Sequence, residues 1–347
     1  MRAVILQGPR NVSVESVPDP TLPSPHGIIV KLEATAICGS DLHLYHGDLP
    51  GDGVQLGHEG IGTVVEAGPS VTSVAVGDRV LLSAVVACGI CGPCRSGDPV
   101  CCVQGMINAV GTVPQYPGAQ AEFIAVDHAD SFVRKIDAGL TVEQAVLLTD
   151  ILPTGYLGAK MADIQPGASV AVYGLGPVGT MAVHAAKLFG PSVIYAIDND
   201  PERLKAAADL GAQPIDARAV PASQQLLEAT EGRGVDAAIE AIGHDATVTD
   251  ATYAVAAGGT VSVVGVNLNM ALPLPMGLMF FKRLTVRAAF AAIPGTWDAL
   301  VPLLQQGVIV PDSIFTHRMG LTEAVAAYEL FDTHADGCRK ILLDPSR

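Results

Sequence analysis

The sequence is short of basic residues. Its 20 lysines and arginines stand against 35 aspartates and glutamates, giving a formal net charge of −15. Nucleic acids are bound through their phosphates, which require a basic surface. We therefore expect no nucleic-acid partner, and we interpret the acidity as a contribution to solubility rather than to fold.

Long apolar runs are also missing. The longest, such as residues 251–266, are interrupted by Gly, Thr and Ser and stay below the roughly 18 residues of a spanning helix. The N-terminal segment reaches Gly8 and Pro9 after a few apolar residues, which is too short for the core of a signal peptide. We expect a cytoplasmic protein with no membrane partner.

Five of the seven cysteines fall in one stretch, CGICGPCRSGDPVCC, residues 88–102. Because cytoplasmic thiols stay reduced, clustered cysteines indicate a metal site rather than disulfides. The spacing Cys88-x2-Cys91-x2-Cys94-x7-Cys102 suits a zinc ion held by four thiolates. An iron–sulfur cluster and unligated thiols are the alternatives. Spacing alone does not decide between Cys101 and Cys102, and we favour Cys102.

Four protein sulfurs leave no position for water or substrate, so this zinc is expected to be structural and the chemistry to lie elsewhere. The segments ICGSDLH (37–43) and LGHEG (56–60) each adjoin an apolar, strand-like run. Cys38 and His58 are ligands that suit zinc. Their polar neighbours in this apolar setting are Ser40, Asp41, His43 and Glu59. Since buried charges need partners, such a group indicates a site.

The second half of the chain contains a dinucleotide-binding pattern. GLGPVG (174–179) follows the strand-like SVAVYG and opens a predicted helix, and VIYAID (193–198) ends on an acid. In this loop Gly174 permits a tight turn, Gly176 lets the backbone approach a pyrophosphate, and Gly179 permits close helix–strand packing. The loop is completed by Leu175, Pro177 and Val178.

Asp198 is expected to bond the adenosine ribose and to favour NAD(H) over NADP(H), since it would repel a 2′-phosphate. Arg203 follows in a helix opened by Pro201, where we interpret it as a solvated charge. Strands and helices continue to alternate, with a helix predicted over 246–259 and strands over 260–266 and 283–290. This order predicts a parallel sheet with helices on both faces.

In this order and spacing the motifs CGSDLH, GHEGIGTVVEAG, VGDRV, DILPTGY and GLGPVG, with the cysteine stretch, resemble the zinc-dependent medium-chain alcohol dehydrogenase family over essentially the whole chain. The resemblance implies an α/β protein with two domains. Residues 1–152 would form a GroES-like β-barrel catalytic domain, completed by a return segment at 291–347. Residues 153–290 would form a Rossmann domain with a doubly wound parallel sheet.

The resemblance also implies site residues. Cys38, His58 and Asp150 would bind the catalytic zinc, with Asp150 where the family commonly has cysteine; this segment is similar to the glutathione-independent formaldehyde dehydrogenase branch. Asp41 would orient His58, and Glu59 would be a neighbouring acid or transient ligand. The remaining cofactor contacts implied are Thr154, Val264, Gly265, Val266 and Arg339.

The implied reaction is hydride transfer between an alcohol, aldehyde or ketone and NAD(H), with two zinc ions per chain. Zinc would polarise the substrate oxygen, and its proton would pass from Ser40 through the cofactor ribose to His43. The alternatives are a zinc-free quinone or alkene reductase on the same scaffold and a non-catalytic NAD-binding protein. Ala84, where many members have a bulky pocket residue, suggests room for a larger substrate.

Family habit further suggests a homodimer or homotetramer. The segment 283–290 reads as a long, apolar strand, and an exposed sheet edge of that kind pairs readily with another chain.

Overall fold

The computed structural model describes residues 1–347 except 106, 137–138 and 312–313. The chain divides into two compact units, one of Met1–Pro153 with Ala292–Arg347 and one of Thr154–Ala291. Each division falls one residue from a predicted domain boundary. No helix in the described part of the chain combines the length and hydropathy needed to cross a bilayer.

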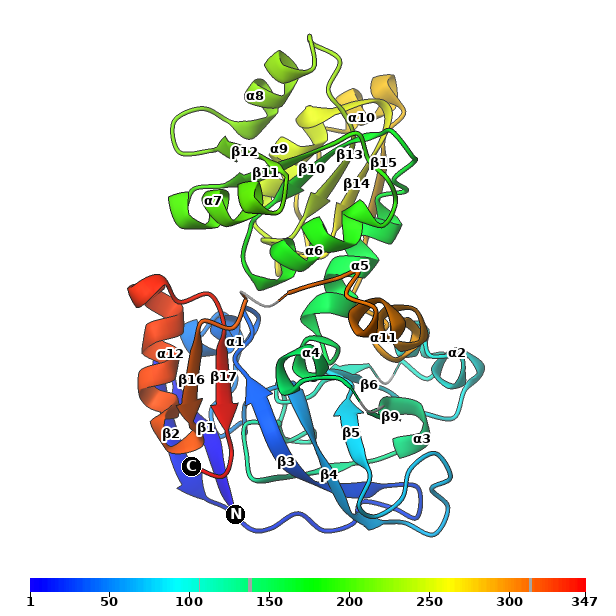
Figure 1. The fold of residues 1–347 in the computed structure, drawn as a ribbon, viewed down its shortest axis with the longest axis vertical. Helices are drawn as coiled ribbons and strands as arrows, with labels where there is room; N and C mark the ends of the chain where they lie inside the picture. Colours follow the sequence, from blue (N-terminus) through cyan, green and yellow to red (C-terminus); the bar gives the residue numbers. More distant parts are fainter. Residues whose placement is uncertain (106, 137–138, 312–313) are drawn as a thin grey trace. The chain divides into compact units, whose positions relative to one another are not determined.

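The first unit is built on a seven-stranded sheet with the order β16-β17-β3-β4-β5-β9, in which β8 also pairs with β3 (Figure 1). A hairpin of β1 and β2 and a short β6–β7 pair complete its strands. The strands are β1 (Arg2–Gly8), β2 (Asn11–Ser16), β3 (Ile28–Ala36), β4 (Glu59–Ala67), β5 (Arg79–Leu82), β6 (Val85–Val86), β7 (Asn108–Ala109), β8 (Phe123–Val126), β9 (Val133–Lys135), β16 (His317–Gly320) and β17 (Ile341–Asp344). The helices are α1 (Asp41–His46), α2 (Gly92–Arg95), α3 (Ala129–Phe132), α4 (Val142–Leu147), the first residues of α5 (Ile151–Met161), α11 (Trp297–Gln305) and α12 (Ala324–Thr333).

The second unit contains a six-stranded, all-parallel sheet with the order β12-β11-β10-β13-β14-β15. The strands are β10 (Ser169–Tyr173), β11 (Val193–Asp198), β12 (Gln213–Asp216), β13 (Val235–Glu240), β14 (Val255–Val263) and β15 (Thr285–Ala288). The helices are the rest of α5, α6 (Pro177–Lys187), α7 (Pro201–Asp209), α8 (Ala222–Ala229), α9 (Asp245–Ala254) and α10 (Met276–Lys282).

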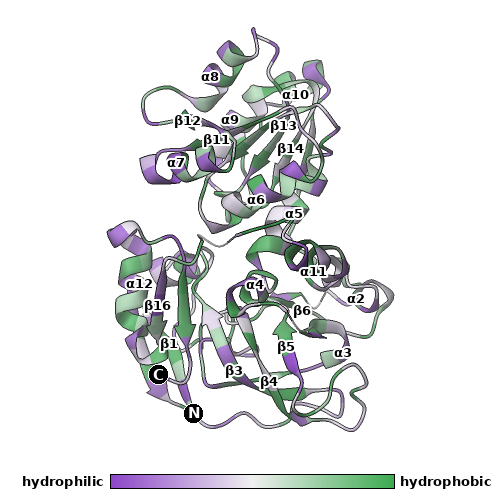
Figure 2. Ribbon diagram, in the orientation of Figure 1, coloured by the Kyte–Doolittle hydropathy of each residue, from purple (hydrophilic) through white to green (hydrophobic). Residues whose placement is uncertain are grey.

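Helices cover both faces of this sheet, as the alternation along the chain predicts. Val170 and Val172 of β10 pack into one hydrophobic cluster with residues of α6 and α7. Ala171 and Tyr173 belong to a second cluster, with residues of α8 and α9. Because successive side chains of a strand point to opposite faces, β10 separates two cores. The strands accordingly carry the hydrophobic colour in Figure 2, whereas α7 is largely hydrophilic.

Two sequence predictions in this unit are wrong in extent. The helix predicted over 246–259 ends at Ala254, and β14 begins at Val255, which is buried and pairs with Val235. The strand predicted over 283–290 is confined to the four residues of β15, because Arg283 adopts a left-handed conformation at the end of α10. β12 and α8 were not predicted.

One exposed carboxylate fixes a loop of the first unit. Asp130, at the start of α3, accepts hydrogen bonds from the backbone and hydroxyl groups of both Thr72 and Ser73. Partial burial raises the pKa of Asp130, but these hydrogen bonds outweigh it and lower the pKa from 3.8 to about 2. A carboxylate with a lowered pKa stabilises the fold above its ordinary pKa and loses that contribution as the pH falls through the lowered value.

We therefore expect Asp130→Ala to lower the free energy of unfolding by about 1 kcal/mol at pH 7, discounted for exposure to solvent. Urea denaturation of the variant and the wild type measures the difference, which should shrink between about pH 4 and pH 2. Equal stability of the two proteins at pH 7 would contradict this role.

Candidate functional site

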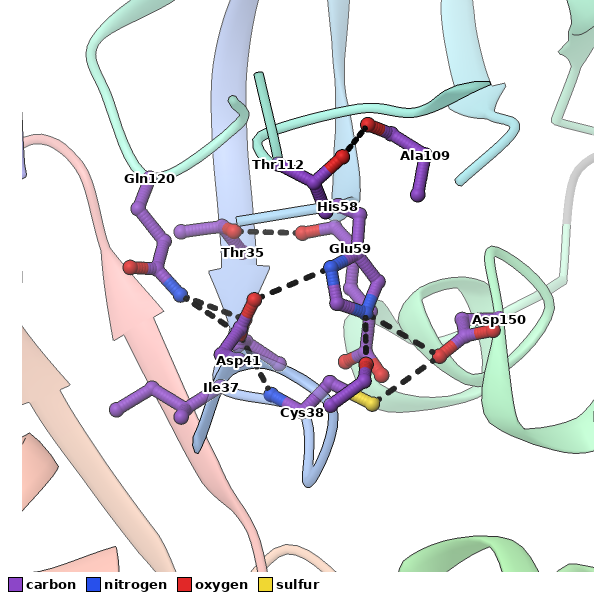
Figure 3. A network of polar contacts seen from close by, with 12 residues as sticks. Thr35, Ile37, Cys38, Asp41, His58, Glu59, Ala109, Thr112, Gln120 and Asp150 are labelled. Carbon is purple, nitrogen blue, oxygen red and sulfur yellow. Dashed lines mark hydrogen bonds and ion pairs between the residues drawn. The ribbon is translucent and has the colours of Figure 1, made fainter. Parts of the chain in front are cut away.

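The pairing of β3 with β4 brings two distant segments together. Ala36, the last residue of β3, is opposite Glu59, the first residue of β4. Cys38 follows β3 by two residues and His58 directly precedes β4, so both side chains leave the same end of the sheet. Asp150 comes from a third segment, between α4 and α5. Ligand atoms of Cys38, His58, Glu59 and Asp150 all lie within 4.8 Å of one another (Figure 3).

The cluster is compact and largely closed to solvent. Cys38 Sγ lies 3.2 Å from Asp150 Oδ2, and His58 Nε2 lies 3.5 Å from the same oxygen. Burial and the Asp150 charge raise the pKa of the Cys38 thiol. Burial also acts to raise the pKa of Asp150, but the hydrogen bond and charge of His58 prevail and lower it to about 2. The neighbouring groups thus favour the ionised form of Asp150, whereas the Asp150 charge disfavours ionisation of the Cys38 thiol.

Asp41, on α1, orients the histidine. Its Oδ1 lies 3.1 Å from His58 Nδ1, and its Oδ2 accepts a hydrogen bond of 2.9 Å from the Cys38 backbone N–H. Burial lowers the pKa of His58, but Asp41 and Cys38 outweigh it and raise the pKa well above its ordinary value. With Nδ1 facing Asp41, Nε2 is directed toward the thiol and Asp150, as in metal sites whose histidine ligand is held by a carboxylate.

Glu59 has a partner that sequence reasoning missed. Lys340 and Glu59 are both fully buried, and Lys340 Nζ lies 2.8 Å from Glu59 Oε1 and 2.7 Å from Oε2. Lys340 also donates to the Ile37 carbonyl. Burial raises the pKa of Glu59, with Lys340 acting against it. The lysine follows Arg339 directly before β17, and a charged residue entering an apolar strand was the available signal.

The donor set fits a zinc ion. A thiolate, an imidazole and a carboxylate are all zinc ligands, and three protein ligands leave a position for substrate or water. The residues that would hold the ion are Cys38, His58 and Asp150, with Glu59 within reach but tied to Lys340. Two anionic donors buried side by side are costly without a compensating cation.

The cysteine lobe, residues 88–102, forms a second candidate metal centre. Ligand atoms of Cys88, Cys91, Cys94 and Cys102 lie within 4.8 Å of one another, whereas Cys101 is exposed. Burial and the neighbouring thiols raise the pKa of Cys94 to about 12. A zinc ion bound by all four sulfurs would keep them deprotonated and would have no open position, so the donor set fits a structural site.

The glycine loop lies at the carboxyl end of β10 and leads into α6, which starts with Pro177, Val178 and Gly179. Gly174 has a φ of +84°, and a Cβ on Gly179 would lie 1.7 Å from the Gly174 carbonyl oxygen. Both positions therefore require glycine, for the turn and for close packing respectively. A Cβ on Gly176 would meet only an Arg203 nitrogen at 4.0 Å, so its backbone is open to a ligand.

Asp198 ends the neighbouring strand β11, and its Oδ2 accepts a 2.7 Å hydrogen bond from Leu175 N–H. Its Oδ1 accepts from the N–H groups of the next two residues. The interpretation of Arg203 as a solvated charge is wrong. Its side chain is only 16% exposed and lies 3.8 Å from Asp198, because the first turn of α7 faces the loop.

The other predicted contacts are spread over both units. Ser40 Oγ lies 3.1 Å from His58 Nε2, whereas the ring of His43 lies 3.1 Å from Asp48. Thr154 is on α5, and Ala84 is buried in the first unit. The backbone N–H groups of Val264 and Gly265 donate to the Glu240 carbonyl at the end of β13, with Val266 next to them. Arg339 is partly buried, and its N–H donates to Thr316.

Comparison with known proteins identifies the family. Residues 24–137 match the family model described as "Alcohol dehydrogenase GroES-like domain", and residues 177–306 match "Zinc-binding dehydrogenase". The Mycobacterium tuberculosis protein named "Probable zinc-binding alcohol dehydrogenase Rv1895" is 47% identical over 94% of this chain and 84% of its own length.

Solved structures agree over the full length. Alcohol dehydrogenase TADH from Thermus sp. ATN1 is 39% identical, with a TM-score of 0.92 and 99% of both chains covered. A Sinorhizobium meliloti protein described as "a putative zinc-binding dehydrogenase", whose structure is bound to NADP, is 30% identical with a TM-score of 0.85 over 99% of both chains. The likeness of the Asp150 segment to the formaldehyde dehydrogenase branch stays a prediction. The chain belongs to the zinc-dependent medium-chain alcohol dehydrogenase family, and it is an oxidoreductase that uses zinc and a nicotinamide cofactor.

Proposed function

We propose that this protein interconverts alcohols with aldehydes or ketones at a zinc held by Cys38, His58 and Asp150, using NAD(H). The observation that carries the proposal is the buried cluster of thiolate, imidazole and carboxylate donors within 4.8 Å of one another. A zinc-free quinone or alkene reductase would have no use for these three residue types in one buried cluster.

The four-cysteine lobe would hold a second, structural zinc. Clustered cysteines that bind metal are typical of the reducing cytoplasm, which is the compartment we propose.

The chain's own residues would supply the remaining functions. When bound, zinc supplies a Lewis acid for the substrate oxygen and the nicotinamide supplies the hydride acceptor. Ser40 lies beside the ligand atoms and would accept the proton of the substrate hydroxyl. His43 would receive that proton by way of the cofactor ribose, since imidazole titrates near neutral pH. The Asp48 carboxylate, 3.1 Å from His43 Nδ1, would hold the ring in place.

The second unit, Thr154–Ala291, would hold the cofactor along the carboxyl ends of its parallel strands, where such folds bind ligands. Gly174, Gly176 and Gly179 would cradle the pyrophosphate at the N-terminus of α6, with Pro177 and Val178 in the same turn. Asp198 would bond the adenosine ribose. Further contacts proposed from the family resemblance are Thr154 and Val264 to Val266 at the nicotinamide and Arg339 at the pyrophosphate.

The first test is the catalytic site itself. Cys38→Ser should lower kcat/KM for NAD+-linked alcohol oxidation by at least about 10³-fold, since a missing Lewis acid costs several kcal/mol. The zinc content should fall from two ions per chain to one. The matched control is Cys101→Ala, an exposed cysteine beside the lobe, which should retain both ions and full activity. Undiminished turnover of Cys38→Ser across primary, secondary and aromatic alcohols would refute the proposal.

The second test concerns cofactor choice. Asp198→Ala removes a carboxylate that would bond the ribose and repel a 2′-phosphate, and Arg203 is left facing the loop. We expect the ratio of kcat/KM for NADP+ to that for NAD+ to rise about 10- to 100-fold, equivalent to about 1.4 to 2.7 kcal/mol. Adding Arg203→Ala should reverse most of the gain. A wild-type enzyme that already prefers NADP+ would contradict the assigned role of Asp198.

We also propose that the enzyme is a homodimer or homotetramer assembled through the β15 edge of unit 2. β15 pairs only with β14 in the described sheet. Beside it, α10 exposes Phe280 and Phe281 at 75% and 85%, and Phe290 is 58% exposed. Exposed apolar groups next to an open sheet edge favour pairing with another chain.

Phe281→Asp should therefore lower the molar mass measured by light scattering. Val76→Asp, which changes a 64% exposed valine in unit 1, is the control and should leave the mass unchanged. A monomeric wild-type protein would remove the proposal.

A further inference from the structure

The return segment of the first unit connects the cysteine lobe to the loop that carries Asp150. Gly295 N–H donates a 2.9 Å hydrogen bond to the carbonyl of Gly97, which lies within the lobe. A Cβ on Gly295 would lie 2.6 Å from that oxygen, so only glycine permits this approach. Figure 1 accordingly draws α11, which follows Gly295, beside α2 of the lobe. The lobe and the return segment therefore approach each other closely at backbone atoms of Gly97 and Gly295.

Two residues after Gly295, Trp297 contacts the segment that leads to Asp150. Its side chain is buried, 3% exposed, and the indole Nε1 donates a 2.8 Å hydrogen bond to the carbonyl of Leu148. Leu148 is the C-cap residue of α4 and precedes Asp150 by two residues. Carbonyl groups at a helix end lack intrahelical partners, and a buried one needs a donor. Trp297 supplies that donor and so fixes the backbone from which Asp150 extends.

The carbonyl group of the next residue, Thr149, is bound by the segment that enters the lobe from its N-terminal side. Ala84 N–H donates to the carbonyl of Thr149 at 3.3 Å, and both residues are buried. Ala84 lies four residues before Cys88 in the chain. Each of the two peptides that precede Asp150 is thus bound by a segment that either enters the lobe or docks against it.

We infer that the four-cysteine lobe positions Asp150 for the catalytic metal, acting through the Gly97–Gly295 contact and Trp297. A metal ligand must be held in place by its surroundings, and loss of such support costs 10- to 100-fold in metal affinity in other proteins. Gly295 and Trp297 are therefore positioning residues that touch neither substrate nor cofactor. The inference rests on the proposed zinc site at Cys38, His58 and Asp150.

The test is the rate at which the holoenzyme releases zinc to a colorimetric chelator. In Gly295→Ala the added Cβ forces the return segment away from Gly97. We expect the ion bound by Cys38, His58 and Asp150 to leave about 10- to 100-fold faster than in the wild type. His58→Ala, which should retain only the lobe ion, identifies which release phase belongs to which site. Cobalt placed in the catalytic site should also show a changed visible absorption spectrum in Gly295→Ala.

Two further variants separate this role from general damage to the lobe. Gly92→Ala adds a Cβ within the same lobe where nothing lies within 4 Å, and it should release zinc like the wild type. Trp297→Phe keeps an aromatic ring but removes the N–H that binds Leu148, and it should accelerate release as Gly295→Ala does. Trp297 is the only tryptophan, so a red shift of emission in Gly295→Ala reports directly on its displacement.

Wild-type release rates in both Gly295→Ala and Trp297→Phe would overturn the inference while leaving the proposed function intact. Equal acceleration by Gly92→Ala and Gly295→Ala would overturn it as well, since any change in the lobe would then suffice. A wild-type protein that holds one zinc, unchanged by His58→Ala, would instead refute the proposed catalytic site.

Discussion

The antiparallel register of β3 is the constraint on which the site depends. Its last residue, Ala36, pairs with Glu59 on one side and with Leu342 of β17 on the other. The first pairing sets Cys38 beside His58, and the second sets Lys340 beside Glu59. A shift of one residue would turn these side chains to the opposite face of the sheet. The hydrophobic alternation that buries β3 therefore also determines which polar groups meet at its end.

Charge balance explains the arrangement around that end. The site gathers the carboxylates of Asp41, Glu59 and Asp150 and the thiol of Cys38 in a buried region where isolated charge is costly. Lys340 offsets Glu59, and His58 is held between Asp41 and Asp150. The thiol and Asp150 would be balanced by a metal cation, and three protein ligands would leave it a position for substrate. Four sulfurs of the cysteine lobe would leave no such position, so a zinc ion there would serve structure and support.

Much of this could be predicted from short-range patterns. The cysteine spacing, the glycine loop between a strand and a helix, and the acid ending β11 each depend on residues close in sequence. What the sequence did not reveal depends on contacts between distant segments. Lys340 meets Glu59 only because β17 joins the sheet beside β3, and Arg203 is only 16% exposed because α7 faces the glycine loop. β12 (QPID) was missed since it is short, contains proline and has a single buried residue, Ile215.

The most direct test of the account is anomalous diffraction at the zinc absorption edge from crystals of the metal-loaded enzyme. We expect two peaks per chain. One should be bound by the thiolate of Cys38, the imidazole of His58 and the carboxylate of Asp150, and the other by four cysteine sulfurs. A single peak in the lobe, with Cys38, His58 and Asp150 too far apart to share an ion, would contradict it.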